Sequence, residues 1–241
     1  MRVHSVESLA ALDGEGLRYA VFLNGCPLRC IYCHNPDTWN PCAGQEKTPD
    51  ELFAKIRRCL PYFKAGNGGV TFSGGEPLLQ AEGINALAAL LRTEHIGYTI
   101  DTCGCVPLSA AVRTAVKNAD LVICDLKFPE EDSFRLYTGG TLQTVLDFLD
   151  YLRRIGQRTW IRTVVVLGIN DSTAWLDRYL ELLRPFTAVI EKYQLLGYHT
   201  MGAFKYEKLG IPNPLSGCPA MDPQRLQVLQ EYVDQAIPGQ K

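Results

Sequence analysis

Short β-rich runs alternate with longer amphipathic stretches along most of the chain. The candidate strands are residues 19–24, 69–72, 98–101, 121–125, 159–166 and 189–195, and the candidate helices are 49–60, 78–94, 108–117, 141–155, 173–183 and 222–236. From residue 68 onward each strand and the helix after it have about the length of one crossover connection. This alternation predicts βα units and a parallel sheet.

Two of the candidate strands, around residues 121–123 and 164–166, are continuous apolar runs without polar alternation. Such runs are expected where helices cover the sheet. Six units are fewer than the eight of a closed barrel, so we expect an α/β fold built as a partial, TIM-like (β/α)6 barrel. No linker or charge block divides the chain, which predicts one domain over residues 1–241, with function at the carboxyl ends of the strands.

Composition and charge exclude several classes of protein. The chain is 46% hydrophobic and 21% charged, which excludes a disordered chain, and Lys plus Arg minus Asp plus Glu is 24 − 26 = −2. This balance gives no basic surface for nucleic acid or for an anionic membrane. No apolar run approaches the roughly 18 residues of a membrane helix. Charged residues within positions 1–23 argue against a secretion signal, so we expect a cytoplasmic protein.

Three of the nine cysteines, Cys26, Cys30 and Cys33, fall on one short loop after the first candidate strand. Structural zinc and iron–sulfur electron carriers generally take four protein ligands, so three cysteines leave one metal position open, as in catalytic sites. A zinc knuckle completed by His34 or Cys42 is the alternative, but the second cysteine pair that such a site normally has is absent. Cys59 and Cys124 are expected to be small buried side chains.

Polar residues gather just past the candidate strands. Asp125 and Lys127 are two residues apart at a strand end, so their side chains can share a face, although a surface ion pair is the ordinary alternative. Gly74 and Gly75 permit close approach of a ligand to the backbone, or form an ordinary turn. Arg162 lies in an otherwise apolar strand and needs an anionic partner.

The cysteine loop, with Tyr32 before its last cysteine, resembles the signature of radical S-adenosylmethionine (SAM) enzymes. Within that group the chain is most similar to the activating enzymes of glycyl radical enzymes, of the pyruvate formate-lyase type. The segments that carry the resemblance are 13–18 (Asp-Gly-Glu-Gly-Leu-Arg), 33–39 (Cys-His-Asn-Pro-Asp-Thr-Trp), 73–77 (Ser-Gly-Gly-Glu-Pro), 101–104 (Asp-Thr-Cys-Gly), 125–127 (Asp-Leu-Lys), 160–162 (Trp-Ile-Arg) and 198–199 (Tyr-His).

The resemblance implies a role for each motif. The three loop cysteines would hold one 4Fe-4S cluster whose fourth iron binds SAM. The residues that would bind or orient SAM are Tyr32, Cys33, His34, Gly74, Gly75, Glu76, Asp101, Asp125, Leu126, Lys127, Arg162 and His199. A monovalent cation beside the SAM carboxylate would be bound by Asp101, Thr102, Asp125 and the carbonyl of Ile123.

Some positions depart from the family pattern. Glu15 stands where proline is usual, Cys103 where asparagine is usual, and the tail 210–223 differs from the usual ending, which leaves the choice of protein partner less determined than the chemistry. Residues 34–72 hold only Cys42 and Cys59, so the ferredoxin-like insert of some related activating enzymes is missing. The short form favours activation of pyruvate formate-lyase.

The expected function is therefore activation of pyruvate formate-lyase. A 5′-deoxyadenosyl radical from SAM would abstract a glycine α-hydrogen, flavodoxin or ferredoxin would donate the electron, and the chain is expected to be a monomer. Within the same chemistry, an activating enzyme for another glycyl radical enzyme, or a small-molecule radical SAM enzyme such as a deazaguanine synthase, is the alternative. From a different class, a non-catalytic metal-binding or electron-transfer module would need four ligands and would not bind SAM.

Overall fold

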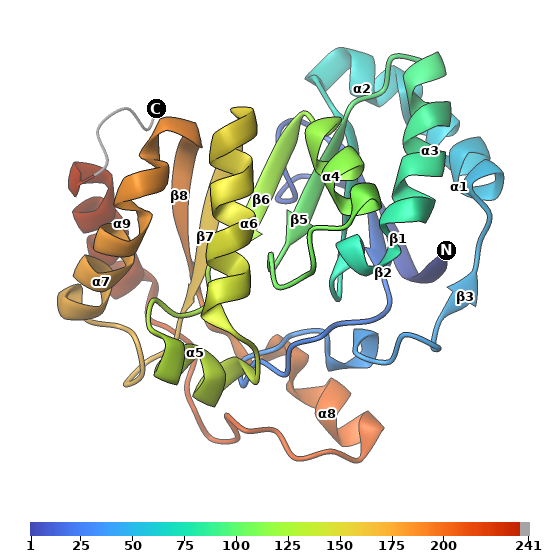
Figure 1. Ribbon diagram of the computed structural model, residues 1–241. Coiled ribbons are helices and arrows are strands. Elements are labelled where there is room, and N and C mark those ends of the chain that lie inside the picture. Colours follow the sequence, from blue (N-terminus) through green and yellow to red (C-terminus); the bar gives the residue numbers. More distant parts are fainter. Residues whose placement is uncertain (237–241) are drawn as a thin grey trace. The chain divides into compact units, whose positions relative to one another are not determined.

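The computed structural model describes residues 1–236, which form two compact units. The first unit comprises Met1–Pro27, Thr38–Thr102 and Val106–Ile123. The second comprises Leu28–Asp37, Cys103–Cys105 and the chain from Cys124 onward. Figure 1 labels the helices and strands along the chain. The last five residues of the domain predicted over 1–241 lie outside the described part, and the single domain stays a prediction.

The first unit is built on strands in the spatial order β3-β1-β2-β4-β5. Their bounds are β1 Arg2–Ala10, β2 Arg18–Leu23, β3 Gln45–Glu46, β4 Gly69–Gly74 and β5 Tyr98–Thr102. β2 pairs with β4 and β4 with β5 in parallel, whereas β1 is antiparallel to both β2 and β3. The three strands predicted here are confirmed. β1 was missed because most of its side chains are exposed and form no apolar run.

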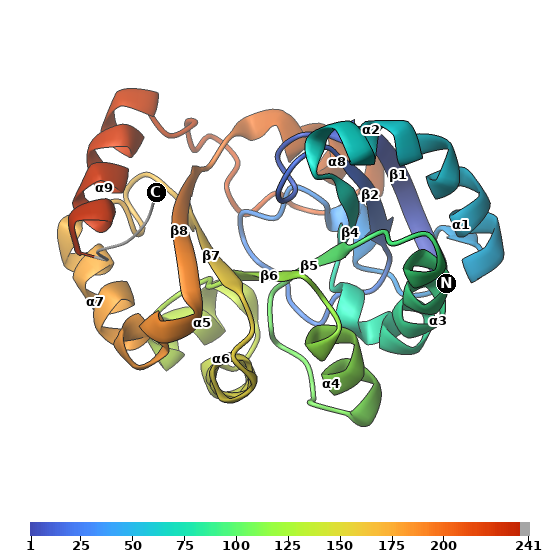
Figure 2. The same cartoon turned by 90° about the horizontal axis from the view of Figure 1, so that it is seen from above.

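The predicted segments 49–60, 78–94 and 108–117 each contain a helix of the first unit, whereas the helix over residues 60–66 was not predicted. They are α1 Pro49–Ile56, α2 Leu60–Gly66, α3 Ala81–Thr93 and α4 Ala110–Lys117, with 3-10 turns η2 Arg57–Cys59 and η3 Pro77–Gln80. The predicted helix 49–60 ends early because Pro61 has no N–H to donate to the preceding turn. α3 contacts both α1 and α4, as Figure 2 shows from above.

Arg18 is buried inside the first unit and binds its neighbours through all three guanidinium nitrogens. Nε donates to Thr71 Oγ1 (3.0 Å), Nη1 to the carbonyl of Glu15 (3.2 Å), and Nη2 to Thr99 Oγ1 (3.0 Å) and the carbonyl of Val70 (2.6 Å). Burial lowers the pKa of Arg18 to about 10. The Asp-Gly-Glu-Gly-Leu-Arg segment is thereby attached to the first residues of β4 and β5.

β6 (Leu121–Asp125) begins in the first unit and ends in the second, where β7 (Thr159–Val165) and β8 (Ile190–Gly197) pair in parallel. The helices here are α5 Glu131–Thr138, α6 Leu142–Ile155, α7 Thr173–Leu183, α8 Ala203–Leu209 and α9 Pro223–Ala236, with 3-10 turns η4 Arg184–Val189 and η5 Thr200–Gly202. α9 packs on β8 and on α7. The predicted strands and the predicted α6, α7 and α9 are confirmed.

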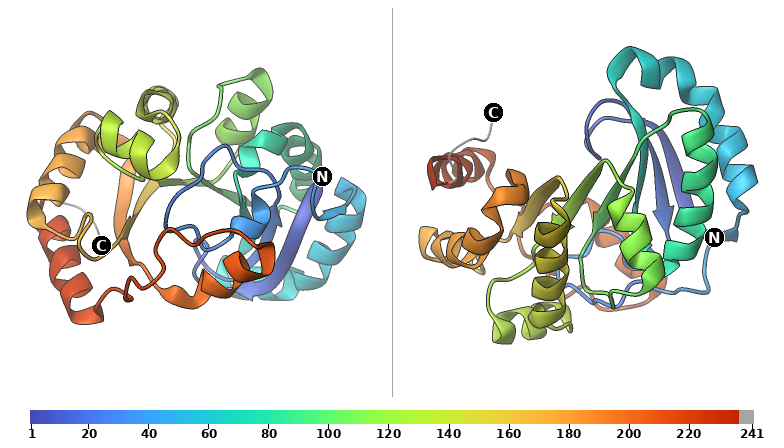
Figure 3. Two further views of the ribbon diagram at one scale, coloured as in Figure 1. Left: turned by 90° about the horizontal axis from the view of Figure 1, so that it is seen from below. Right: turned by 45° about the horizontal axis from the view of Figure 1, so that its top comes forward.

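Two helices of the second unit, α5 and α8, were not predicted because each spans only two turns and lacks an apolar stripe of helix length. Figure 3 shows how the chain leaves β8, forms α8 and returns to α9. Cys59 and Cys124 are buried, as predicted. None of the helices in the described part of the chain is long and apolar enough to cross a membrane.

Candidate functional site

At the carboxyl ends of β4 and β5, polar side chains of the first unit contact one another. Ser73 Oγ donates to Asp101 Oδ2 at 2.8 Å. Glu76 is fully buried, and its carboxylate accepts from the hydroxyl of Thr102 and from the backbone N–H of Leu78 (2.9 Å). The predicted residues of these two strand ends are therefore brought together.

Gly74 and Gly75 form a turn against the backbone that leads to Cys26. Gly75 donates to the carbonyl of Leu23 at 2.9 Å, and the N–H of Glu76 donates to the carbonyl of Gly25 at 2.7 Å. Gly74 has φ +111°, and a Cβ at Gly75 would overlap the carbonyl oxygen of Gly25. Gly74 and Gly75 thus allow the protein's own backbone, at Leu23 and Gly25, to pack closely against this turn.

In the second unit the cysteine loop is held by backbone hydrogen bonds to the end of α5. The N–H groups of Arg29 and Ile31 donate to the carbonyls of Thr138 (2.7 Å) and Tyr137 (3.0 Å). These two amides flank Cys30, which is buried, while Cys33 is half-buried. The last turn of α5 was not recognised from the sequence, although Gly139 in the left-handed conformation is a typical helix end.

The third loop cysteine, Cys26, is half-buried and belongs to the first unit. Its N–H lies 3.4 Å from the carbonyl oxygen of Trp39. Among residues 1–236, the nine cysteines are thiols that form no disulfide, and no three His, Cys, Asp or Glu side chains are arranged as a ready metal site. The predicted ligand set of Cys26, Cys30 and Cys33 stays a prediction.

Asp125 and Lys127 form an ion pair with 2.6 Å between Lys127 Nζ and Asp125 Oδ2. Their side chains are 27% and 12% exposed, so this is not the ordinary surface pair. Burial by itself would lower the pKa of Lys127, but the carboxylate of Asp125 holds it well above its usual value. Tyr179 donates its hydroxyl hydrogen to the carbonyl of Lys127 at 2.8 Å. The side chain of Lys127 therefore carries a positive charge at neutral pH and lies on the same face as Asp125.

Leu126, between Asp125 and Lys127, is hydrogen-bonded to β7 through its backbone. Its N–H donates to the carbonyl of Arg162 at 2.9 Å, and its carbonyl accepts from Thr163 Oγ1 at 2.9 Å. Arg162 is itself buried, at 8% exposure. Arg162 is therefore held in the same part of the second unit as the Asp125–Lys127 pair.

Tyr32 lies within the cysteine loop with its hydroxyl buried and without a hydrogen-bond partner. Its ring is 6.1 Å from that of Phe128, centroid to centroid. Burial raises the pKa of Tyr32 well above its usual value, so the hydroxyl keeps its proton. A buried donor without an acceptor is costly, which fits a position that a bound ligand completes.

His34 and His199 stack with their ring centroids 3.8 Å apart and their planes 5° apart. His34 Nε2 lies 2.8 Å from the carbonyl oxygen of His199. Burial lowers the pKa of His34, which favours the neutral ring at neutral pH. Because a carbonyl only accepts, Nε2 carries the hydrogen of this ring. The two predicted histidines are thus brought together.

The four groups predicted to bind a monovalent cation are divided between the units. Asp101, Thr102 and Ile123 belong to the first unit and Asp125 to the second. Asp101 accepts from Ser73, Thr102 donates to Glu76, and Asp125 pairs with Lys127. The cation site stays a prediction.

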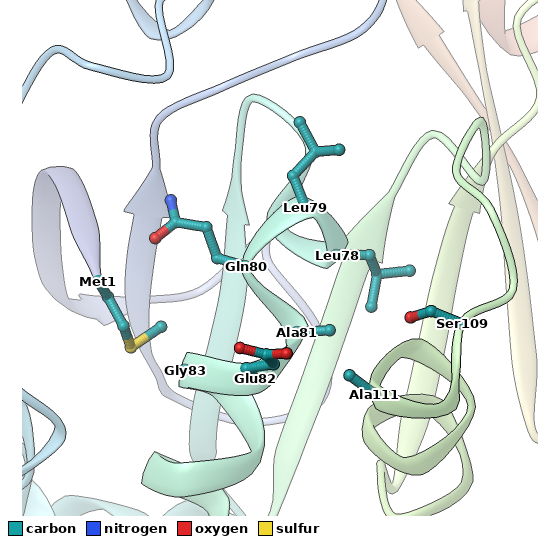
Figure 4. A pocket seen from close by; sticks show the side chains of 9 residues that line it. All are labelled: Met1, Leu78, Leu79, Gln80, Ala81, Glu82, Gly83, Ser109 and Ala111. Atoms are coloured by element: carbon teal, nitrogen blue, oxygen red, sulfur yellow. The ribbon is translucent and has the colours of Figure 1, made fainter.

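A pocket of about 360 Å³ opens in the first unit beside Met1, where α3 and α4 begin. Figure 4 shows Glu82, Gln80 and Ser109 among the side chains around it. None of the predicted site residues lines this pocket. It is therefore separate from the motifs described above.

Comparison with known proteins relates these motifs to a family. The model of the Radical SAM superfamily matches residues 20–178. The chain is 40% identical over 236 residues to the "Pyruvate formate-lyase-activating enzyme" of Clostridium pasteurianum, covering 98% of each chain. The chain belongs to the pyruvate formate-lyase-activating enzyme family of the radical SAM superfamily.

Two solved structures of low sequence identity share the fold of this activating-enzyme family member. Streptococcus suis SuiB bound to precursor peptide SuiA has a TM-score of 0.67 at 17% identity and covers 90% of this chain and 45% of its own. A radical SAM methyltransferase from Sphaerobacter thermophilus has a TM-score of 0.65 at 16% identity, covering 98% of this chain and 75% of its own. The predicted fold class, a partial barrel of the radical SAM type, is confirmed.

As a member of the activating-enzyme family, the protein is a radical SAM enzyme that uses a 4Fe-4S cluster and SAM. The residues present fit both groups. Thiolates are the usual protein ligands of iron–sulfur clusters, and the cysteines of the loop are thiols. The unpartnered hydroxyl of Tyr32, in the same loop, supplies a buried donor for a ligand.

Proposed function

We propose that this protein activates pyruvate formate-lyase by installing a glycyl radical on it. The observation that carries the proposal is the 40% identity to an enzyme of that name over nearly the whole length of both chains. The alignment covers 98% of each chain, so the similarity is not confined to the cysteine loop.

Cys26, Cys30 and Cys33 are proposed to bind the 4Fe-4S cluster through their thiolates and to leave one iron open to SAM. A bound cluster would supply the electron for reductive cleavage of SAM to methionine and a 5′-deoxyadenosyl radical, and this radical would take the α-hydrogen of a glycine. The hydrogen bonds from Arg29 and Ile31 to the end of α5 fix the backbone on both sides of Cys30.

The remaining motif residues are proposed to orient SAM and to exclude water. Gly74 and Gly75 present backbone to the methionine amino group, and Glu76 assists there. Tyr32 and the backbone of Cys33 and His34 contact adenine. The other residues proposed to bind or orient SAM are Asp101, Asp125, Leu126, Lys127, Arg162 and His199. Asp101, Thr102, Asp125 and the carbonyl of Ile123 are the proposed ligands of a monovalent cation.

Partner and location complete the proposal. The substrate is a glycine in an extended loop of the glycyl radical enzyme, bound chiefly through its backbone, and the electron donor is a reduced flavodoxin or ferredoxin. The chain acts as a monomer and as one radical SAM domain over residues 1–241. A cytoplasmic location fits the nine cysteines, because an odd number argues against a disulfide framework.

The test is anaerobic reconstitution with iron and sulfide, followed by incubation with pyruvate formate-lyase, SAM and a chemical reductant. Electron paramagnetic resonance should show a glycyl radical on pyruvate formate-lyase, with methionine and 5′-deoxyadenosine formed. Cys30→Ala should abolish both, whereas Cys42→Ala, which changes an exposed cysteine outside the loop, should not. Cleavage of SAM without a radical on any glycyl radical enzyme would contradict the proposal and favour a small-molecule substrate.

A further inference from the structure

The segment 198–206, which follows β8 and includes the start of α8, contacts residues 33–37, which begin at the last loop cysteine. Both segments belong to the second unit. His34 contributes the first contact, because its ring stacks on that of His199 and its Nε2 donates to the carbonyl of the same residue. Gly202, three residues further along, also approaches this turn: a Cβ there would lie 3.0 Å from both Cα and the carbonyl oxygen of His34.

Two side chains of α8 add polar contacts to the same stretch. Tyr206 donates its hydroxyl hydrogen to the carbonyl of Cys33 at 2.9 Å. Lys205 Nζ lies 2.8 Å from Asn35 Oδ1 and 3.1 Å from Asp37 Oδ1. The side chains of Lys205 and Asp37 are only 20% and 26% exposed, so this ion pair is less screened by water than a surface pair.

The same contacts also fix the position of α8. A seven-residue helix is too short to be stable in isolation, so its position depends on its tertiary contacts. Phe204, on the same helix, is 51% exposed, whereas Tyr206 is 3% exposed. α8 therefore turns Tyr206 inward, toward the chain at Cys33.

We propose that Lys205, Tyr206 and the imidazole side chain of His34 position Cys33 and His199 for the cluster and SAM. The inference rests on the proposed function, because it assigns Cys33 and His199 their roles. Lys205 and Tyr206 act through the backbone and side chains of residues 33–37 and do not touch the reacting atoms. Segment 198–206 thereby couples the end of the cysteine loop to a part of the chain about 170 residues away in sequence.

The first test uses the protein before reconstitution, so that it does not depend on the cluster. Tyr206→Phe and Lys205→Met should raise the hydrogen-exchange rates of the amides of residues 33–35 and 37 by about fivefold, the effect of losing one hydrogen bond. Lys208→Met is the matched control, because Lys208 lies on the same helix but stacks on Phe204. Lys205→Arg keeps the charge and should restore slow exchange.

The second test uses the reconstituted enzyme. Tyr206→Phe and Lys205→Met should lose iron to a chelator faster than the wild type by about the same factor, and SAM should change their paramagnetic resonance signal less. Exchange and iron loss indistinguishable from Lys208→Met would overturn the inference. A wild type that binds no cluster would instead overturn the proposed function, while the exchange rates of residues 33–37 would still show whether α8 holds this segment.

Discussion

Thr102 donates its hydroxyl hydrogen to the buried carboxylate of Glu76, with Thr102 Oγ1 2.8 Å from each carboxylate oxygen. The contact joins the end of β5 to the residues just after β4. Because Glu76 also accepts from the N–H of Leu78, its carboxylate caps the turn η3 that follows. Glu76, which is predicted to help bind SAM, therefore also fixes the ends of β4 and β5 relative to each other.

Replacing Thr102 with valine should destabilise the protein by about 1–3 kcal/mol, because a buried carboxylate loses a hydrogen-bond donor without regaining water. Urea unfolding followed by circular dichroism measures the change. Thr114→Val is the matched control, since Thr114 is exposed on α4 and bonds only to the carbonyl of Ala110; it should change stability by about 0.5 kcal/mol or less. Equal effects of the two substitutions would show that the Glu76 contact contributes nothing.

Gly75→Ala should push the backbone at Gly25 away, because the new Cβ would overlap that carbonyl oxygen. We expect a loss of about 1–3 kcal/mol from this overpacking and a lower iron content after reconstitution, since Cys26 follows directly. The comparison is Gly66→Ala, in α2, where no atom lies within 4 Å of an added Cβ. That variant should be neutral or more stable by up to about 1 kcal/mol. Full iron content in Gly75→Ala would contradict the expectation.

Gln230 of α9 satisfies the backbone of β8 with its side-chain amide. Its Oε1 accepts from the N–H of Leu195 (2.7 Å), and its Nε2 donates to the carbonyl of Tyr193 (2.8 Å). Gln230→Leu should cost about 1–3 kcal/mol and speed hydrogen exchange at the Leu195 amide. Gln227→Leu, on the same helix, removes only a contact with Glu231 and should leave that amide slow. Unchanged exchange at Leu195 in Gln230→Leu would refute this account.

Glu51 forms a capping box with Thr48 at the start of α1. Its hydrogen bond from the Thr48 backbone N–H lowers the pKa of Glu51. Since the folded-state pKa lies below the unfolded one, the stabilisation is present above the unfolded value and is lost as the pH falls through the folded value. Glu51→Gln keeps the capping geometry but not the charge. Its Tm should lie below that of the wild type at about pH 7, and the gap should narrow steadily as the pH falls below about 4. A gap that stays constant with pH would exclude the charge as its cause.

Predictions from sequence succeeded where the signal is local. The apolar runs at β6 and β7 and the amphipathic periods of α6 and α9 identify buried strands and helices without knowledge of their neighbours. β1 and α8 were missed for the same reason, since neither carries an apolar pattern of its own. The position of β1 depends on its pairing with β2 and β3, and that of α8 on its contacts with residues 33–37, which no local period records.

By itself, the sequence determined the βα order and the cysteine spacing, and it placed the polar motifs at the strand ends. Burial imposes periodicity along each element, and metal binding imposes spacing along a loop, so both are written into neighbouring residues. Only the tertiary structure decided that Arg18 secures the segment before β2, that Gly75 packs on Gly25, and that Tyr206 bonds to Cys33. Each of these pairs joins residues that are distant in sequence. Many residues of the chain could have accepted a hydrogen bond from Arg18 or Tyr206, or packed against Gly75. Which residue does so is decided only when the chain is packed.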